Sequence, residues 1–360
     1  MSVVFITNYF NSHLKELCDE LSLYYKDEFI FFEIGDEESN FEKSRVLVKK
    51  PAYVKVFQKE YLNKIDEANV VIAGCAPFKL LKNRIRKNKL TFLYQERPLK
   101  KGIEPLKYIP RYIKWHLRYG NSNNCYILCA SSFTSSDYAK FNLFKYKCLR
   151  FGYFPNRNKA DVNYKNKDYD SIFVGRLVDL KHPEIFLDVC SKMIYEIPNF
   201  KAAIVGDGPL YEFVSDYIAK NNLNNNVHLL GYLDNKKTIE MMVRSKTLIF
   251  CSDRREGWGA VVNESMSCGC VPFVNKVIGS AEFLIDEGIN GFIFENSNDL
   301  FNKLLKAFKY HSLDFISKEA KSTIDEEWNG IVAARRLIEL IENLSFVTKY
   351  KKGPVSLIEN

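Results

Sequence analysis

Two carboxylates bracket a glycine turn in the segment SDRREGWGAVVNESMSCGCVPF, residues 252–273. Glu256 precedes the Gly-Trp-Gly turn, and Glu264 stands one turn inside a helix expected to begin near Ala260. A carboxylate in that position can accept two hydrogen bonds from vicinal hydroxyls, as a ribose presents them. Helix capping or a surface role is the alternative for either glutamate.

An earlier segment, FVGRLVDLKHPEIFLDVC, places Gly175, Arg176 and Lys181 in a turn between a strand and a helix. Free amides and the dipole at a helix N-terminus favour anions. An arginine and a lysine there suit a diphosphate, because they neutralise the charge that grows as a leaving group departs. Loop arginines and lysines are more often solubilising, which is the competing interpretation.

The turn IVGDGP at 204–209 contains Gly-Asp-Gly without the full G-x-G-x-x-G spacing of a dinucleotide site. It fits a plain left-handed turn equally well. The segment GYLDNKKTIEMM that begins at Gly231 is ambiguous in the same way.

These turns need a scaffold of alternating strands and helices. Short β-branched and aromatic runs alternate with amphipathic segments along the chain, which predicts parallel sheets covered by helices. The predicted strands are 3–7, 29–34, 69–74, 90–95, 125–130, 171–175, 202–206, 227–231, 247–252 and 271–275.

The chain has 360 residues, too many for one ordinary core. The strand pattern restarts at 171 after a polar stretch at 157–170, which predicts a linker between two domains. A last helix is expected from about Asn329 to Asn343, followed by a polar tail.

At this point the motifs resemble a known family. E-G-W-G-A-V-V-N-E is similar to the E-x7-E motif of family-4 retaining glycosyltransferases, and Gly175-Arg176 with Lys181 resembles that family's phosphate-binding G-R-x-x-x-x-K. The resemblance extends to GDGP, HLLGYL, SCGCVPFVNKVIGSAEFLIDEGINGFIF and WNGIVAARRLIELI, and so covers nearly all of the second domain. Upstream, KLLKNRIRKNKLTFLYQERPLKKG and YILCASSFT resemble a bacterial subgroup that assembles surface polysaccharides.

The resemblance implies an α/β GT-B fold, in which two doubly wound Rossmann-like domains face each other across a cleft. Residues 1–155 would form a basic, acceptor-binding domain that faces the membrane. Residues 156–342 would bind the nucleotide-sugar donor, and 343–360 would be a C-terminal tail.

It also implies a role for each matching residue. Glu256, Arg176 and Lys181 would be the catalytic residues, with Glu256 on hydroxyls of the transferred sugar and the two cations on the diphosphate. Glu264 would hold the ribose. The remaining donor-binding residues would be Gly175, Gly206, Asp207, Gly208, Tyr232, Leu233, Gly257, Trp258 and Gly259.

The acceptor side carries less information. The first loop, TNYFNSHLKEL, lacks the paired glycines of many relatives. His13 would reach the acceptor side, although a lone histidine at a helix start is more often structural. Glu96 and Arg97 are assigned there too, with an internal ion pair as the alternative.

The expected reaction is hexosyl transfer with retention, which uses no cofactor and no metal. The donor would be a nucleotide-diphosphate sugar, with UDP preferred over GDP by family frequency. The acceptor would be a glycan or lipid-linked glycan in the synthesis of bacterial surface polysaccharide, lipopolysaccharide or capsule.

Charge is concentrated in the first half of the chain. Residues 1–154 hold 26 basic against 16 acidic residues, and Lys79 to Arg118 holds thirteen basic residues with Glu96 and Glu104 as its acids. Interleaved aromatic residues let such a stretch bind nucleic acid by stacking, or lie on an anionic bilayer with its rings at the headgroups. A solvated basic face is the alternative.

The nine cysteines lack zinc-site spacing and predict small buried residues in a reducing cytosol. The first residues lack the features of a signal peptide, and no window approaches ~20 apolar residues. We therefore expect a cytoplasmic protein attached peripherally to the inner face of the cell membrane.

Four rival functions share some of these features. A sugar-nucleotide epimerase or a phosphorolytic enzyme would bind a similar donor in the same fold, and a non-catalytic nucleotide-sugar sensor would bind it without turnover. A nucleic-acid-binding protein would explain the basic stretch but leave the E-x7-E turn unexplained, so no nucleic-acid partner is expected.

Overall fold

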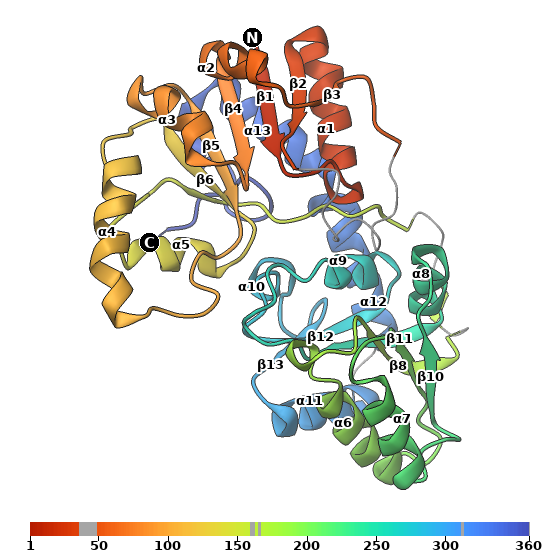
Figure 1. Cartoon of the computed structure of the whole chain (residues 1–360). Helices are drawn as coiled ribbons and strands as arrows, with labels where there is room; N and C mark the ends of the chain where they lie inside the picture. The colour runs from red at the N-terminus through yellow and green to blue at the C-terminus, as the bar shows by residue number, and fades with distance from the viewer. Residues whose placement is uncertain (36–48, 159–162, 165–166, 311–312, 360) are drawn as a thin grey trace. The chain divides into compact units, whose positions relative to one another are not determined.

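The computed structural model describes residues 1–35, 49–158, 163–164, 167–310 and 313–359. The chain forms two compact units, each built on its own sheet (Figure 1). The first unit comprises Met1–Asn156 with Trp328–Asn360, and the second comprises Arg157–Glu327. Part of the predicted linker at 157–170 lies outside the described residues.

The first unit contains a parallel sheet in the order β3-β2-β1-β4-β5-β6-β7. Its central strands are apolar runs buried on both faces, as a parallel sheet between helices requires. The strands are β1 (Val3–Thr7), β2 (Phe29–Glu33), β3 (Val54–Val56), β4 (Val70–Gly74), β5 (Thr91–Gln95), β6 (Cys125–Cys129) and β7 (Cys148–Arg150).

The helices of this unit are α1 (Ser12–Tyr25), α2 (Leu62–Glu67), α3 (Phe78–Arg86), α4 (Pro105–Tyr119), α5 (Phe133–Ala139) and α13 (Gly330–Glu342). Helix α1 buries Leu14, Leu17, Cys18 and Leu21 on one face, as their spacing predicts. The Asn11 side chain caps it by accepting from the backbone N–H of His13 at 3.0 Å.

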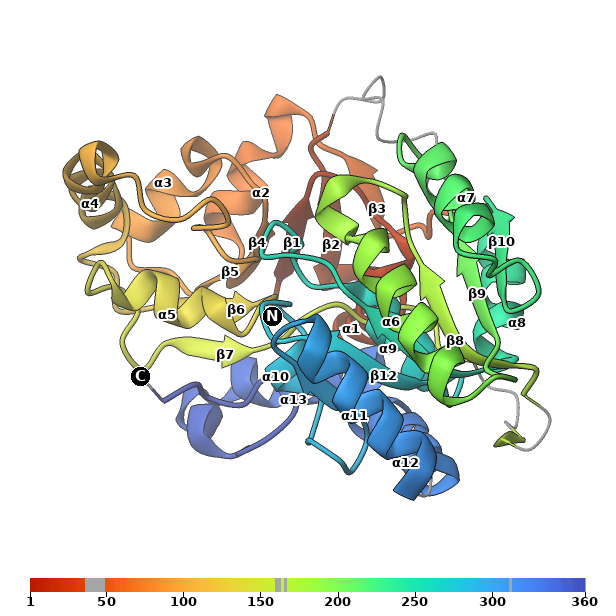
Figure 2. The ribbon, with the colours of Figure 1, turned by 90° about the horizontal axis from the view of Figure 1, so that it is seen from below.

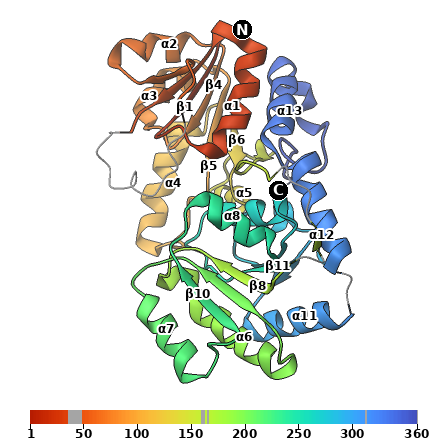
Figure 3. The same ribbon diagram turned by 90° about the vertical axis from the view of Figure 1, so that its right-hand side faces the viewer.

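Helix α13 belongs to the first unit, whereas the sequence assigned it to the second domain, which was expected to run to residue 342. Figure 3 shows α13 beside α1. The N–H of Gly330 donates to Glu16 Oε2 at 2.8 Å, and a Cβ on Gly330 would lie 2.6 Å from the backbone N of Leu17. An amphipathic pattern shows that a helix has a buried face, but it does not show which sheet that face covers. The assignment of α13 from the sequence alone was therefore wrong.

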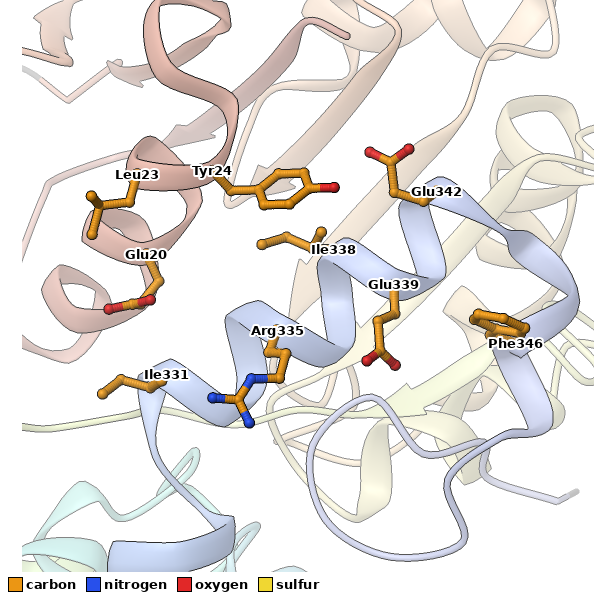
Figure 4. Close-up of a pocket in the computed structure, with 9 residues that line it drawn as sticks. All are labelled: Glu20, Leu23, Tyr24, Ile331, Arg335, Ile338, Glu339, Glu342 and Phe346. Carbon is orange, nitrogen blue, oxygen red and sulfur yellow. The ribbon is translucent and has the colours of Figure 1, made fainter.

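A groove of about 560 Å³ runs along the seam between α1 and α13 (Figure 4). Side chains from both helices and from the turn Leu344–Thr348 line it. Leu23 and Tyr24 stand on one wall and Ile338 on the other. At Tyr25 a hydrogen bond joins the two helices: the Tyr25 hydroxyl donates to Glu342 Oε1 at 3.4 Å.

The C-terminal residues pair with the edge strand β7. Leu357 lies opposite Leu149 in an antiparallel bridge, and the N–H groups of Val355 and Ile358 donate to the carbonyls of Arg150 and Cys148 at 2.7 and 2.8 Å. The segment predicted as a tail without a role therefore covers a sheet edge that would otherwise expose unpaired backbone groups.

The second unit holds a parallel sheet in the order β10-β9-β8-β11-β12-β13. The order reverses between β8 and β11, and in open α/β sheets ligands bind beyond the carboxyl ends of the strands at such a point. The strands are β8 (Tyr169–Val174), β9 (Ala202–Val205), β10 (Val227–Gly231), β11 (Ser245–Phe250), β12 (Val271–Asn275) and β13 (Phe292–Phe294).

Helices cover both faces of this sheet. On one face α6 and α11 lie side by side (Figure 2) and share a core with Phe173, Phe186 and Leu300. The helices are α6 (Pro183–Glu196), α7 (Tyr211–Lys220), α8 (Asn235–Val243), α9 (Ala260–Ser267), α10 (Ala281–Leu284), α11 (Ser297–Tyr310) and α12 (Leu313–Ser322). A π-helical turn at Thr323–Glu327 follows and leads back to the first unit.

Candidate functional site

The loops that follow β8, β9, β10 and β11 meet at the carboxyl edge of the second sheet. Backbone hydrogen bonds join them in sequence: Gly175 N to Val205 O at 3.0 Å, Gly206 N to Gly231 O at 2.8 Å, and Asp253 N to Leu180 O at 2.9 Å. The residues predicted to bind a donor are carried by these loops, so the fold brings them to one edge.

Glycines let two of these loops touch through their backbones. A Cβ on Gly206, where φ is +149°, would lie 1.9 Å from the carbonyl O of Gly175. A Cβ on Gly208 would lie 2.5 Å from the carbonyl O of Leu177. The Gly-Asp-Gly turn is therefore a close backbone contact that no larger residue can make.

Lys181 and Glu256 form an ion pair with 2.5 Å between Nζ and Oε2. Lys181 follows β8 and Glu256 follows β11, and both side chains are mostly buried. The ammonium also lies 4.8 Å from the centre of the Phe250 ring. A cation and an acid from two separate motifs thus meet at one place.

Arg176, which directly follows Gly175 and stands five residues before Lys181, is exposed. Among the described residues, no side-chain hydrogen bond or ion pair engages its guanidinium. An unengaged guanidinium at a strand end is available for a planar oxyanion ligand.

His182 and Asp253 join the two loops that carry Lys181 and Glu256, and the sequence did not single them out. His182 adopts a left-handed conformation with φ of +50°, and its ring nitrogens lie 2.6 Å from Glu184 Oε1 and 3.3 Å from Asp253 Oδ2. Burial raises the pKa of Asp253, but hydrogen bonds from Arg255 and His182 outweigh it and hold that pKa below its ordinary value. The one available signal was a histidine directly after the phosphate-motif lysine.

The Gly-Trp-Gly turn is held by its carbonyl groups. The carbonyls of Gly257 and Trp258 accept from the N–H groups of Gly279 and Ser280 at 3.2 and 3.1 Å. Because a trans peptide directs its N–H opposite to its C=O, the amides of Trp258 and Gly259 point to the other side of the turn. This orientation is compatible with the role predicted for these amides.

Trp258 itself is a core residue. It is 1 % exposed, and its indole N–H donates to Asn263 Oδ1 at 2.7 Å. Gly259, with φ of +84°, packs so closely that a Cβ would lie 2.7 Å from the Phe250 ring. The turn is therefore anchored from inside, and all three of its residues are buried.

Glu264 lies in the second turn of α9 and is partly exposed. Desolvation raises the pKa of its carboxyl from an ordinary 4.5 to about 7. No hydrogen bond or ion pair to this carboxyl occurs within the described ranges. A raised pKa without a protein partner is typical of a group that awaits a ligand, although burial alone also produces it.

The remaining predicted donor residues lie in the same loops. Asp207 is exposed and its carboxylate accepts from the N–H of Gly208 at 2.7 Å. Tyr232 is 73 % exposed after β10, and Leu233 precedes Asp234, the N-cap of α8.

Two of the three residues predicted for the acceptor side are linked in the first unit. The His13 ring stacks on Tyr153 with centroids 5.8 Å apart, and the Tyr153 hydroxyl donates to Glu96 Oε1 at 2.7 Å. Lys100 also pairs with Glu96. All of these lie at the carboxyl edge of the first sheet, after β1, β5 and β7.

Arg97 is directed elsewhere. It is buried, pairs with Asp137 of α5 at 3.3 Å through both Nε and a terminal nitrogen, and lies 4.4 Å from the Phe133 ring centre. The internal ion pair that the sequence left open for this residue is present, with Asp137 as the partner.

The aromatic residues of the basic stretch pack against other parts of the first unit, and the placement of their rings on nucleic acid or at lipid headgroups stays a prediction. Phe92 and Tyr94 are buried in β5, and the rings of Tyr108 and Trp115 pack on Phe141. Apolar rings gain more from burial in the unit than from exposure.

Several classes of group are absent from the described residues. No cluster of three or more His, Cys, Asp and Glu side chains there has the arrangement of a metal site. None of the helices in the same ranges combines the length and apolar content needed to cross a bilayer. Cys268 and Cys270 are fully buried, as predicted for packing residues.

Residues 156–314 match the family model Glycosyl transferases group 1. The chain is 30 % identical over 203 residues to an uncharacterized glycosyltransferase of Methanocaldococcus jannaschii, which covers 56 % of this chain and 54 % of that one. It is 29 % identical over 139 residues to the poly(glycerol-phosphate) alpha-glucosyltransferase of Bacillus subtilis, 39 % of this chain and 20 % of the enzyme. The matches thus span about half or less of these curated relatives.

Solved structures establish the fold. Anabaena HepE in complex with UDP has a TM-score of 0.69 at 16 % identity, over 95 % of this chain and 100 % of HepE. TarM has a TM-score of 0.61 at 18 % identity, over 79 % of this chain and 57 % of TarM. The protein has a GT-B fold with two Rossmann-like α/β domains, as predicted, and nearly all of its match to the glycosyltransferase group 1 model lies in the second unit.

Proposed function

We propose that this protein is a family-4 retaining glycosyltransferase that moves a hexose from a nucleotide-diphosphate sugar to a glycan or lipid-linked glycan acceptor in bacterial surface-polysaccharide synthesis. The observation that carries the proposal is the Lys181–Glu256 pair at the carboxyl edge of the second sheet, within the segment that matches the family. The donor's nucleotide in this proposal is UDP rather than GDP; the structural neighbour HepE has been solved with UDP and with UDP-glucose.

In this proposal the donor's diphosphate lies against Arg176 and Lys181. Both cations follow β8, where helix dipoles and free amides already favour an anion. Their positive charge stabilises the nucleoside diphosphate as it leaves, so the chain needs no metal ion for this step.

Glu256 acts on the transferred sugar as a hydrogen-bond acceptor for its hydroxyls. Its ion pair with Lys181 fixes the position of the carboxylate, which suits a positioning group better than a nucleophile. The amides of the Gly-Trp-Gly turn lie beside it in the chain and donate to the same hydroxyls. Retention then follows from attack on the face that the diphosphate leaves, with the leaving phosphate accepting the acceptor's proton.

Glu264 receives the ribose hydroxyls, and the loops at Gly206–Gly208 and Tyr232–Leu233 frame the base. The first unit supplies the acceptor side, with His13 and Glu96 linked through Tyr153 as its candidate residues. Lipid-linked acceptors require a location at the inner membrane face, to which the basic stretch attaches the protein peripherally.

A panel of nucleotide sugars tests the donor assignment by thermal stabilisation. A ligand that binds only the folded protein adds ~2.7 kcal/mol at ~100 times its dissociation constant. We expect UDP-sugars to raise the melting temperature and Arg176→Ala to abolish the effect. A silent panel would undermine donor binding altogether.

Product analysis tests the reaction. With a lipid-linked acceptor and the stabilising donor, we expect a new glycosidic bond whose anomeric configuration matches that of the donor. An epimerised nucleotide sugar with unchanged acceptor would identify the rival epimerase instead, and inversion at the anomeric carbon would exclude the retaining assignment.

A further inference from the structure

Helix α4 has three distinct faces, and the residues of one of them are aromatic, only partly exposed and packed on the rest of the first unit. Tyr108 stacks on Phe141 with centroids 5.0 Å apart, and Trp115 lies 4.7 Å from the same ring. Tyr119 contacts Phe144 at 5.5 Å. These contacts determine which side of α4 faces the rest of the first unit.

The opposite face is aliphatic and uncovered. Its members recur three or four positions apart, so they form one stripe along the helix. They are Leu106, Ile109, Ile113 and Leu117, exposed by 93, 67, 51 and 83 %. Four large aliphatic side chains in a row on one helix exceed the isolated apolar residues that an ordinary surface carries.

Basic residues flank the stripe. Helical periodicity places Lys107, Arg111, Lys114 and Arg118 along one side of it. Helix α3 lies beside α4 on that side (Figure 1), and the two helices enclose a groove of about 540 Å³. The groove is lined by Phe78, Lys82, Arg86, Pro110, Ile113, Lys114, Leu117 and Arg118.

The charge on this surface is not neutralised. Within the described ranges no carboxylate pairs with Lys82, Arg86 or Lys114. Glu104, before the first turn of α4, is the acid at hand, and it pairs with Lys107 at 2.6 Å. A surface of apolar side chains bordered by unpaired basic residues is complementary to a partner whose surface is anionic and whose interior is apolar.

We propose that the face formed by α3 and the aliphatic stripe of α4 docks on a bilayer that contains anionic phospholipids. The stripe enters the acyl boundary, and the basic rim of the groove holds headgroup phosphates. This inference rests on the membrane attachment in the proposed function and specifies its surface, but it does not depend on the transfer chemistry.

A single-stranded nucleic acid fits this face less well. Its bases stack on aromatic rings, whereas here the rings face inward and the outward residues are aliphatic. Buried basic residues of the same stretch also serve the fold. Arg84 donates to the carbonyls of Ile65 and Ala68 at 2.7 Å each, which removes it from the surface.

Co-sedimentation with vesicles tests the proposal. The full chain is mixed with vesicles of phosphatidylcholine alone or with about one third phosphatidylglycerol, and we expect binding to the anionic vesicles that weakens as salt rises. Leu106→Ser with Leu117→Ser should lower the partition coefficient about tenfold or more. Lys82→Ser with Lys114→Ser should lower it by roughly 30-fold.

Matched controls use exposed residues elsewhere. Lys220→Ser with Lys318→Ser removes the same charge from the second unit and should leave vesicle binding unchanged. Circular dichroism and thermal unfolding of every variant confirm that the fold persists, and UDP stabilisation reports donor binding separately. Loss of vesicle binding with UDP binding retained supports the docking surface, whatever the turnover.

Three outcomes would overturn the proposal. Equal binding to neutral and anionic vesicles, or binding that neither the leucine nor the lysine double variant weakens, places the contact elsewhere. A dimer in solution that the double leucine variant dissociates shows that a second copy covers the stripe. A gel shift with single-stranded nucleic acid that the lysine variant abolishes, without vesicle binding, identifies the other class of partner.

Discussion

At the scale of single residues, the Lys181–Glu256 pair couples the two halves of the proposed donor site. The ammonium that would hold a phosphate is engaged with the carboxylate that would hold a sugar hydroxyl. Donor binding therefore competes with, or rearranges, an existing ion pair. This competition makes the two residues separable by experiment.

We expect Lys181→Met to weaken UDP binding by about 30-fold, because a charge-assisted contact to phosphate is lost. Glu256→Gln should leave UDP binding unchanged or tighter, since it releases the lysine, while transfer falls by about 100-fold. Isothermal titration with UDP and initial-rate assays measure both. The exposed Lys276–Glu295 pair offers a control in Lys276→Met. Equal loss of UDP affinity in both variants would mean that the pair serves only to tie two loops together.

Glu264 predicts a dependence of stability on pH. Its pKa is about 7 in the folded protein and 4.5 ordinarily, so between these values the folded state binds more protons than the unfolded state. The free energy of unfolding should therefore fall as pH rises from 4.5 to 7, by about 2 kcal/mol after allowance for the partial exposure of the side chain. Urea unfolding across this range measures it. Glu264→Gln should flatten the profile, and an unchanged slope would assign the effect to other groups.

At the scale of elements, close backbone contact between the loops after β8 and β9 is the feature that a substitution can test. Gly206→Ala forces a Cβ to 1.9 Å from the Gly175 carbonyl in a conformation that L-residues rarely adopt. We expect a loss of 3 kcal/mol or more, at about the upper end of single substitutions. Gly288→Ala is the matched control, because φ is +75° there but no atom lies within 4 Å, and it should cost about 1 kcal/mol. If urea unfolding gives similar losses of stability for the two variants, the backbone conformation and not the close contact determines the cost of the substitution.

The sequence predicted most strands because central strands of a parallel sheet are continuous apolar runs. VVFIT, VHLLG and VPFVN matched β1, β10 and β12 to the residue. The three strands that it missed, β3, β7 and β13, have three residues each and lie at sheet edges. A short edge strand needs little apolar surface, so its composition does not mark it.

For the candidate site, motifs specified which residues gather but not how they contact one another. The predicted helix start at Ala260 is the start of α9, which sets the Gly-Trp-Gly turn before it. The Lys181–Glu256 contact and the His182–Asp253 contact depend on how the loops after two different strands meet, which no local sequence pattern encodes. The inward direction of the α4 aromatics likewise depends on Phe141 and Phe144, outside the helix.

At the scale of the whole molecule, the second unit is a continuous segment inserted into the first. Arg157–Glu327 holds its own sheet and core, whereas Met1–Asn156 lacks α13 and the C-terminal segment that pairs with β7. We expect a fragment of residues 157–327 to unfold cooperatively on its own. A fragment of residues 1–156 should remain poorly folded until a peptide of residues 328–360 is added, because α1 otherwise exposes the apolar face that α13 covers. Circular dichroism melting of each fragment measures this, and a cooperative transition for residues 1–156 alone would contradict it.

The antiparallel pairing of residues 355–358 with β7 also bears on how the chain is made. Synthesis runs from the N- to the C-terminus, so residues 157–327 leave the ribosome before α13 and residues 355–358, which complete the first unit, have been made. Of the two units, the one whose synthesis starts first thus finishes folding last, and its unfinished surface is what a chaperone would encounter on the nascent protein.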